Sequence, residues 1–286
     1  MHARFRGGLA ALLALVLATL LAGCESLQGL FQAAPKPTAR VVEVSIQNLT
    51  LSKVDLVFAI EVTNPYSTSF PLVDLSYVIS SGGHEILRGE VRPNGSIPAR
   101  GSQVIQLPAI VAFASVAKAV KGLRPGSVVP YQADLTLAVD APMLGRVMLP
   151  LSKSGEIPVP AAPEVELASF HISTLSLDRV QASARLRVKN TNSFALDVSR
   201  LDLELALGGS NVGRSSLKNA ARLPPGGTGM LEVPLSFSPR AFGLGLVNLL
   251  RGDKAGYALS GSLEAGSPYG AIALPFSRNG NTPISR

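Results

Sequence analysis

The clearest pattern in this chain is an alternation of apolar and polar residues with a period of two. From Val54 to Val62 every even-numbered residue is apolar and the odd-numbered residues are mixed. From Arg179 to Lys189 the same phase returns more sharply, with apolar residues at even positions and Arg, Gln, Ser or Lys at odd positions. Successive side chains of a β-strand point to opposite faces of the sheet. The alternation therefore predicts antiparallel strands with one face in a core and the other in water.

Two further alternating runs, residues 73–79 and 201–207, end just before a pair of glycines. Gly82-Gly83 and Gly208-Gly209 supply the positive φ angles that tight hairpin turns require. More strands are expected near residues 104–107, 135–139 and 147–151. Roughly seven short strands in a unit of this length are typical of a two-sheet sandwich.

The two halves of the chain are related by an offset of 126 positions. Such an offset indicates a tandem duplication. We therefore predict an all-β chain of two tandem, immunoglobulin-like or fibronectin-III-like antiparallel β-sandwiches, at residues 41–158 and 164–286. Identical residues coincide over roughly eighty positions, among them Leu49 with Leu175, Pro98 with Pro224, and Tyr131 with Tyr257.

Each half also contains one segment with helical spacing. Apolar residues recur every three or four positions and the run ends at a glycine, which predicts one short helix in each sandwich. We interpret both helices as covers for an open end of the core. The alternative is that their apolar faces line a groove for lipid. The residues on these faces are Phe113, Val116 and Val120 in the first half, and Phe242, Leu246 and Leu249 in the second.

The N-terminal residues 1–23 predict a lipoprotein signal peptide. Two arginines precede an uncharged apolar run from Leu9 to Ala22. As a helix this run rises about 21 Å, which is too short for a hydrocarbon core of about 30 Å. Leu21-Ala22-Gly23-Cys24 resembles the lipobox, so we expect cleavage between Gly23 and Cys24. The alternatives are an ordinary signal peptide or an uncleaved anchor.

Cys24 is the single cysteine, so the folded part has no thiol and no disulfide. The lipobox resemblance implies diacylglyceryl and N-acyl chains on this residue, which would hold the protein on a membrane. We expect no other cofactor. Residues 24–40, with Gly29, Pro35 and Pro37, read as a flexible tether. Glu25 after the cysteine favours the periplasmic face of the outer membrane in the sorting scheme of Gram-negative lipoproteins.

A short motif at the end of the first well-patterned strand of each half points to a family. The first half has Asn64-Pro65-Tyr66 and the second Asn190-Thr191-Asn192, each matching two positions of an Asn-Pro-Asn motif. With the sandwich length, the glycine hairpin and the helix, this resembles the late embryogenesis abundant type 2 family, whose module is also called the water stress and hypersensitive response domain. Asn and Pro at a strand end also favour a turn by themselves, so a structural role explains the motif without a ligand.

The resemblance implies a non-enzymatic β-protein associated with tolerance of desiccation and other stress. It also implies an alternative function, a lipid-binding or lipid-transfer module that uses an apolar groove of the sandwich. The mature chain itself offers no enzyme signature. His84 and His171 occupy non-equivalent repeat positions, and neither belongs to a metal-binding spacing. We expect no catalytic residue and no metal site.

Charge separates the two halves. Residues 41–158 hold nine basic and nine acidic residues, whereas residues 164–286 hold thirteen basic and nine acidic ones. A solvated strand face is the plainest reading of the concentrated basic residues, and contact with anionic lipid or an acidic envelope protein is the sharper hypothesis. Nucleic acid is not an expected partner, and the oligomeric state stays open. The basic stripe consists of Arg179, Arg185, Arg187 and Lys189, whose first-half equivalents are Lys53, Ala59, Glu61 and Thr63.

Overall fold

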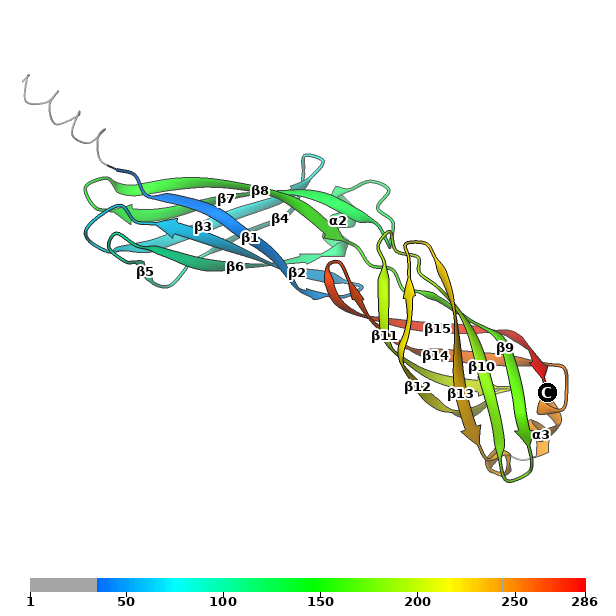
Figure 1. The fold of residues 1–286 in the computed structure, drawn as a ribbon. Helices are drawn as coiled ribbons and strands as arrows, with labels where there is room; N and C mark the ends of the chain where they lie inside the picture. The colour runs from blue at the N-terminus through cyan, green and yellow to red at the C-terminus, as the bar shows by residue number, and fades with distance from the viewer. Residues whose placement is uncertain (1–34, 243) are drawn as a thin grey trace, which may run out of the picture.

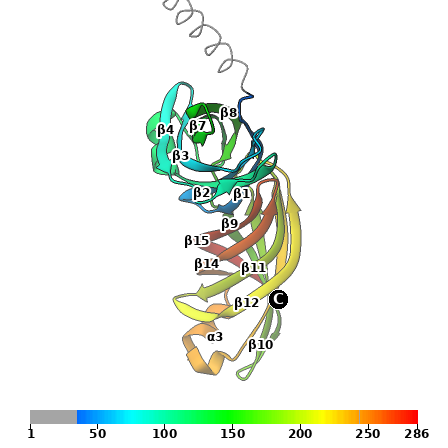
Figure 2. The same ribbon diagram turned by 90° about the vertical axis from the view of Figure 1, so that its left-hand side faces the viewer.

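The computed structural model describes residues 35–242 and 244–286, which form two β-sandwiches arranged lengthwise along the chain (Figure 1). In the first sandwich, a three-stranded sheet with the order β1-β2-β6 packs on a four-stranded sheet with the order β4-β3-β7-β8, and the short β5 pairs with β3. The view along the molecule shows the two layers (Figure 2). The elements of the first sandwich are β1 (Thr38–Leu49), β2 (Lys53–Thr63), β3 (Phe70–Ser81), β4 (His84–Val91), β5 (Ser96–Ile97), β6 (Ser102–Ala112), α2 (Phe113–Ala119), β7 (Val128–Ala141) and β8 (Gly145–Pro158).

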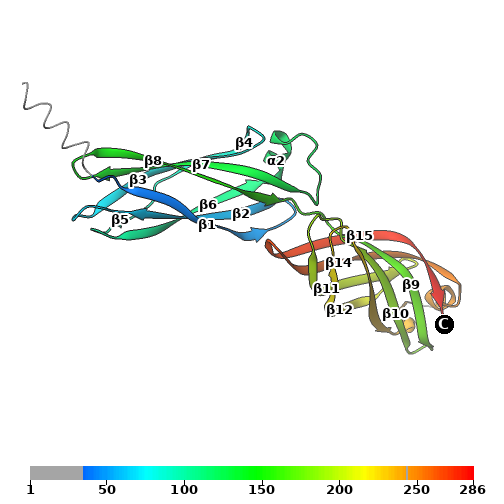
Figure 3. The same cartoon turned by 45° about the horizontal axis from the view of Figure 1, so that its top comes forward.

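The second sandwich repeats this architecture. Its smaller sheet has the order β9-β10-β13 and its larger sheet the order β12-β11-β14-β15. The turned view separates the two units and shows the junction between them (Figure 3). The elements of the second sandwich are β9 (Glu164–Leu175), β10 (Val180–Lys189), β11 (Leu196–Leu207), β12 (Ser210–Leu223), β13 (Thr228–Phe237), η1 (Pro239–Phe242), α3 (Leu244–Leu250), β14 (Lys254–Ser267) and β15 (Gly270–Ser285).

The duplication extends to the bounds of the strands. β1 and β9 begin and end at positions that differ by the same 126 residues, and so do β3 and β11, and β7 and β14. The predicted fold, two tandem all-β sandwiches with one short helical segment each, is confirmed. β1 begins at Thr38, however, so Thr38 to Arg40 belong to the first strand and not to the tether in which the sequence analysis placed them.

Both cores follow the period-two pattern. The even-numbered residues of β2 are at most 1% exposed, and those of β10 at most 7%. At the hairpin turns, Gly82 and Gly83 have φ angles of 55° and 80°, and Gly208 and Gly209 have 53° and 83°. These are the left-handed conformations that a two-residue turn needs and that glycine adopts without strain.

The helical segments pack on the cores, and the described residues of their apolar faces are buried or half-buried there. Phe113 and Val116 are 7% and 0% exposed and belong to the core cluster, as does Leu246 at 3%. Val120 lies just beyond the end of α2, and Leu249 lies within α3; both are half-buried against the core. Phe242 ends the turn η1, and its side chain lies outside what the structure describes.

The signal peptide, Gly23 and Cys24 lie outside the described residues. Among the residues that are described, no helix combines the length and apolar character needed to cross a membrane.

Candidate functional site

The first asparagine of the family motif is a buried hydrogen-bonding hub. Asn64 is 1% exposed and its backbone lies at the end of β2. Its side-chain Nδ2 donates to the carbonyl oxygens of Thr68 at 2.9 Å, Ile97 at 3.2 Å and Pro98 at 2.9 Å. Its Oδ1 accepts from the amide of Tyr66 at 2.8 Å. One side chain thus binds four backbone groups at a buried strand end, although the Pro98 carbonyl also accepts from the amide of Gly101.

Asn190 repeats this arrangement in the second sandwich. Its Nδ2 donates to the carbonyl oxygens of Phe194 at 2.8 Å, Leu223 at 3.3 Å and Pro224 at 3.1 Å, and its Oδ1 accepts from the amide of Asn192 at 3.0 Å. Each partner lies 126 positions after its counterpart around Asn64. These bonds occupy the polar atoms of both side chains, so the structure supports the turn role and offers no free group there for a ligand.

Where the two motif copies differ, the second copy contacts the linker between the domains. Asn192 stands where the first copy has Tyr66 and is 1% exposed. Its Oδ1 accepts from the amide of Ala161 at 2.8 Å, and its Nδ2 donates to the carbonyl of the same residue at 3.2 Å. Thr191, which replaces Pro65, donates from Oγ1 to the carbonyl of Ala162 at 3.0 Å. The junction is therefore built by Asn192, which keeps the third position of the family motif, and by Thr191, which departs from its proline.

The loop after α2 completes this junction from the first domain. The amide of Ser193 donates to the carbonyl of Gly126 at 2.7 Å, and Gly126 has a φ of 89°. A Cβ atom at Gly126 would lie 2.4 Å from the carbonyl oxygen of Thr191, so only glycine fits this approach.

The turn between β14 and β15 makes a second contact between the domains. The Tyr269 hydroxyl donates to Glu156 of the first domain at 3.3 Å, and Phe194 of its own domain meets the Tyr269 ring edge-on, with 5.4 Å between centroids. Burial, followed by the neighbouring Glu156 carboxylate, raises the pKa of the Tyr269 phenol. Leu49 of β1 pairs in parallel with Ile272 of β15. The sequence analysis missed this junction because its partners come from segments far apart in the chain.

The basic stripe is exposed but has acidic partners. Arg187 pairs with Glu166 and Lys189 with Glu164 on the neighbouring β9, each with a shortest separation of 3.4 Å. Arg185 stands opposite Glu232 of β13 in the sheet register. Exposed pairs of this kind contribute little to stability, but the carboxylates reduce the positive potential of the face.

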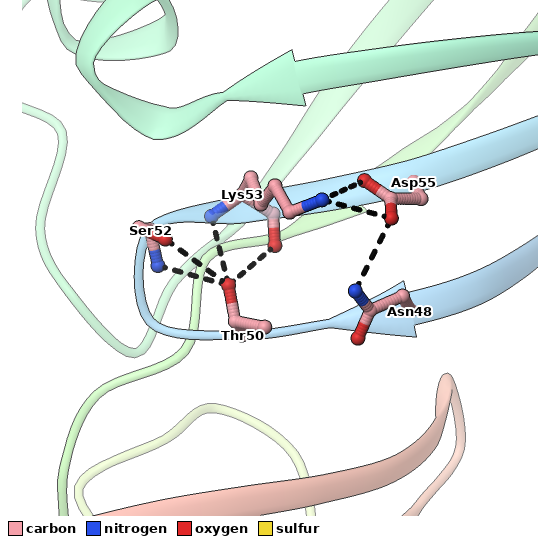
Figure 4. A network of polar contacts seen from close by, with 5 residues as sticks. All are labelled: Asn48, Thr50, Ser52, Lys53 and Asp55. Atoms are coloured by element: carbon pink, nitrogen blue, oxygen red, sulfur yellow. Dashed lines mark hydrogen bonds and ion pairs between the residues drawn. The ribbon is translucent and has the colours of Figure 1, made fainter.

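Arg179, the fourth residue of the stripe, lies before β10 in the turn that follows β9. The Ser176 hydroxyl accepts from the amide of Arg179 and donates to its carbonyl, both at 3.0 Å. In the first domain, Thr50 bridges the amide and carbonyl of Lys53 in the same way, at 3.1 and 3.2 Å (Figure 4). Arg179 is therefore a turn residue with a first-domain counterpart, and the stripe on β10 itself consists of three residues.

The two histidines of the described ranges lie in different sandwiches. His171 contacts Ser285 at 3.1 Å through Nδ1, and His84 lies at the exposed start of β4. Across residues 35–242 and 244–286, no group of three or more His, Cys, Asp or Glu side chains is placed to hold a metal ion.

The family described as late embryogenesis abundant protein, type 2, matches this sequence twice, at residues 59–155 and 185–280. Each match covers one of the two sandwiches, and together they span more than half of the chain. The chain belongs to the late embryogenesis abundant type 2 family. The resemblance to this family in two tandem domains, inferred from the sequence, is confirmed.

Similar proteins carry names related to desiccation. The desiccation protectant protein Lea14 homolog of Glycine max is 31% identical over 131 residues, which are 46% of this chain and 86% of that protein. A desiccation-related protein of Arabidopsis thaliana is 32% identical over 127 residues, 44% of this chain and 76% of that protein. The solution structure of a putative late embryogenesis abundant protein shares 30% identity, with a TM-score of 0.39, over 52% of this chain and 86% of that one. The family match and the two relatives named for desiccation support a stress-related role for this family member.

Proposed function

We propose that this chain is a non-enzymatic, lipid-anchored lipoprotein of the bacterial envelope. In this proposal its two late embryogenesis abundant type 2 domains stabilise envelope components during desiccation or other stress. The observation that carries the proposal is the family match over both sandwiches, together with relatives that are named for desiccation. The lipobox-like Leu21-Ala22-Gly23-Cys24 supports the anchor, and Glu25 supports the outer membrane as its location.

The folded part suits a protective role that needs no chemistry. The helices α2 and α3 pack on the cores, and the side-chain bonds of the buried motif asparagines lie within the chain. Its positive and negative side chains form exposed ion pairs with one another. A surface of mixed charge stays soluble and hydrated without strong attraction to one class of partner. The burial of Phe113, Val116 and Leu246 in the cores favours the protective role over the alternative, a lipid-binding or lipid-transfer module.

The test uses vesicles of envelope phospholipid filled with a self-quenching dye. Vesicles carrying the lipidated protein are dried, rehydrated and measured for dye leakage. We expect less leakage than from bare vesicles, and a smaller effect from the soluble Cys24→Ser protein because the anchor concentrates the domains at the surface. Equal leakage with and without the lipidated protein would contradict the protective role. Failure of Cys24→Ser to abolish palmitate labelling of the protein in cells would contradict the anchor.

A further inference from the structure

The two sandwiches differ at one flank, where an edge strand of the smaller sheet lies beside an edge strand of the larger sheet. In the second sandwich the edge strands β9 and β15 are joined in parallel, with Ile284 opposite Phe170 and Ser285 opposite His171. The amide of Leu167 in β9 also donates to the Tyr257 hydroxyl at 3.3 Å. This flank, the β9–β15 seam, is closed by backbone pairing.

In the first sandwich the corresponding edges are β1 and β8. No backbone pairing joins these two strands in the part of the chain that the structure describes. A cavity of about 580 Å³ opens between them instead, lined by residues 44–46, Leu56, Tyr131, residues 153–156 and residues 268–270. Its volume is within the range of about 300–1,000 Å³ that is common for binding sites. We call this flank the β1–β8 seam.

The lining of the β1–β8 seam includes the strand edges themselves. Its residues come in unbroken runs from β1 and β8, whereas a sheet face would contribute alternate residues. Val44 and Ile46 are only half-buried, while their counterparts Phe170 and Ile172 in the closed seam are 0% and 3% exposed. The open seam therefore leaves apolar side chains partly uncovered beside strand edges that can form further backbone hydrogen bonds.

Tyr131 places a phenol hydroxyl at this cavity. The residue is 5% exposed, and its hydroxyl is open to the cavity, because it is not among the buried side-chain atoms of the described residues that lack a partner. Gly155 makes room for the ring, since a Cβ atom there would lie 2.6 Å from the Tyr131 hydroxyl oxygen. Burial raises the pKa of this phenol above its ordinary value. Its counterpart Tyr257 binds a backbone amide, and Tyr131 lacks that amide.

One strand already pairs with this edge. Ile272 of β15 lies in parallel register with Leu49 at the end of β1, so the outer edge of β1 accepts a parallel strand. We propose that the β1–β8 seam binds an extended segment of a partner polypeptide, which adds to the edge of β1 as a strand and covers Val44 and Ile46. Lys153 and Glu156 contribute one charge of each sign to the lining. The segment is therefore selected by its alternating apolar side chains and its backbone, with no demand for net charge. This site is independent of the protective role.

The test is hydrogen exchange of the soluble Cys24→Ser protein with a probe peptide of sequence Lys-Val-Thr-Val-Thr-Val-Lys, acetylated and amidated. The control peptide has the same side chains but an N-methyl group on every backbone amide, which removes the donors of both strand edges and prevents strand addition. We expect the probe to slow saturably the exchange of amides in residues 43–47 and 152–157, and the control to have no effect. The closed β9–β15 seam is the internal reference and should be unchanged.

A matched pair of variants tests the role of the unpaired hydroxyl. Tyr131→Phe should weaken probe binding about fivefold, the factor for one neutral hydrogen bond, and leave thermal stability unchanged. Tyr257→Phe should leave binding unchanged and lower thermal stability, because it removes a bond that already exists. No protection at millimolar probe, or protection by both peptides alike, would overturn the proposal. So would protection of the seam by phospholipid vesicles but not by the probe, because the occupant would then be lipid.

Discussion

Removal of the buried amide of Asn64 should strongly destabilise the first domain. Asn64→Ala deletes four hydrogen bonds and leaves the amide of Tyr66 and the carbonyls of Thr68, Ile97 and Pro98 without that partner. At a net value of about 1 kcal/mol for each bond, the free energy of unfolding should fall by about 4 kcal/mol. A domain is stable by only about 5–15 kcal/mol, so this is a large share of the total.

The assay is urea unfolding of the soluble Cys24→Ser protein, followed by circular dichroism. Asn190→Ala should cost the second domain a similar amount, because its side chain makes the equivalent bonds. Asn48→Ala is the control, since Asn48 is exposed and bonds only to Asp55 at 3.2 Å; its effect should stay within about 0.5 kcal/mol. A loss below about 1 kcal/mol for both buried asparagines would refute the view that the motif is a structural hub.

Three further predictions concern the edge, the junction and the phenols. Pro108 lies opposite Val57 in the edge strand β6 and has no backbone N–H to offer a neighbouring chain. Pro108→Val should therefore promote self-association, measured by sedimentation velocity. Gln106→Val adds an equally apolar side chain but no new N–H donor and should not promote it. Gly126→Ala should lower the melting temperature and broaden the distribution of inter-domain distances in small-angle scattering. The control Gly122→Ala has a φ of 76° but open space around it, so it should affect only local stability. Equal scattering from the two variants would contradict the role of Gly126 in the junction. Burial raises the pKa of Tyr131 above the ordinary 10.0, so the folded state holds this proton more tightly than the unfolded state. The free energy of unfolding should therefore decrease as the pH rises above 10. Tyr131→Phe should make this decrease shallower in urea unfolding at several pH values, and an unchanged dependence on pH would contradict the raised pKa.

The sequence predicted the fold because the relevant information is local and is present twice. The alternation in β2 and β10 assigns each side chain to the core or to water, and the glycine pairs require the hairpin turns that the structure shows. The 126-residue offset predicts which strands correspond, because both copies must bury the same faces. The ion pairs of Arg187 and Lys189 were also within reach, since an antiparallel hairpin between residues 164–175 and 180–189 places Glu166 and Glu164 beside them.

The junction and the open seam could not be predicted in the same way. Asn192 and Gly126 meet because of how two complete domains pack, and neither residue type alone distinguishes that contact from an ordinary turn. The prediction of the apolar helix face in the first sandwich was only partly right. Helical spacing predicted that Val120 would continue the face of Phe113 and Val116, but α2 ends at Ala119 and Val120 is only half-buried.

The most direct test of the central claim is the survival of cells after drying. A strain that lacks this protein should survive desiccation and rehydration less well than its parent, and the wild-type gene should restore survival while a Cys24→Ser gene, expressed at the same level, should not. Equal survival of the deletion strain and its parent would contradict the proposed role in stress protection, and full rescue by Cys24→Ser would contradict the need for the lipid anchor.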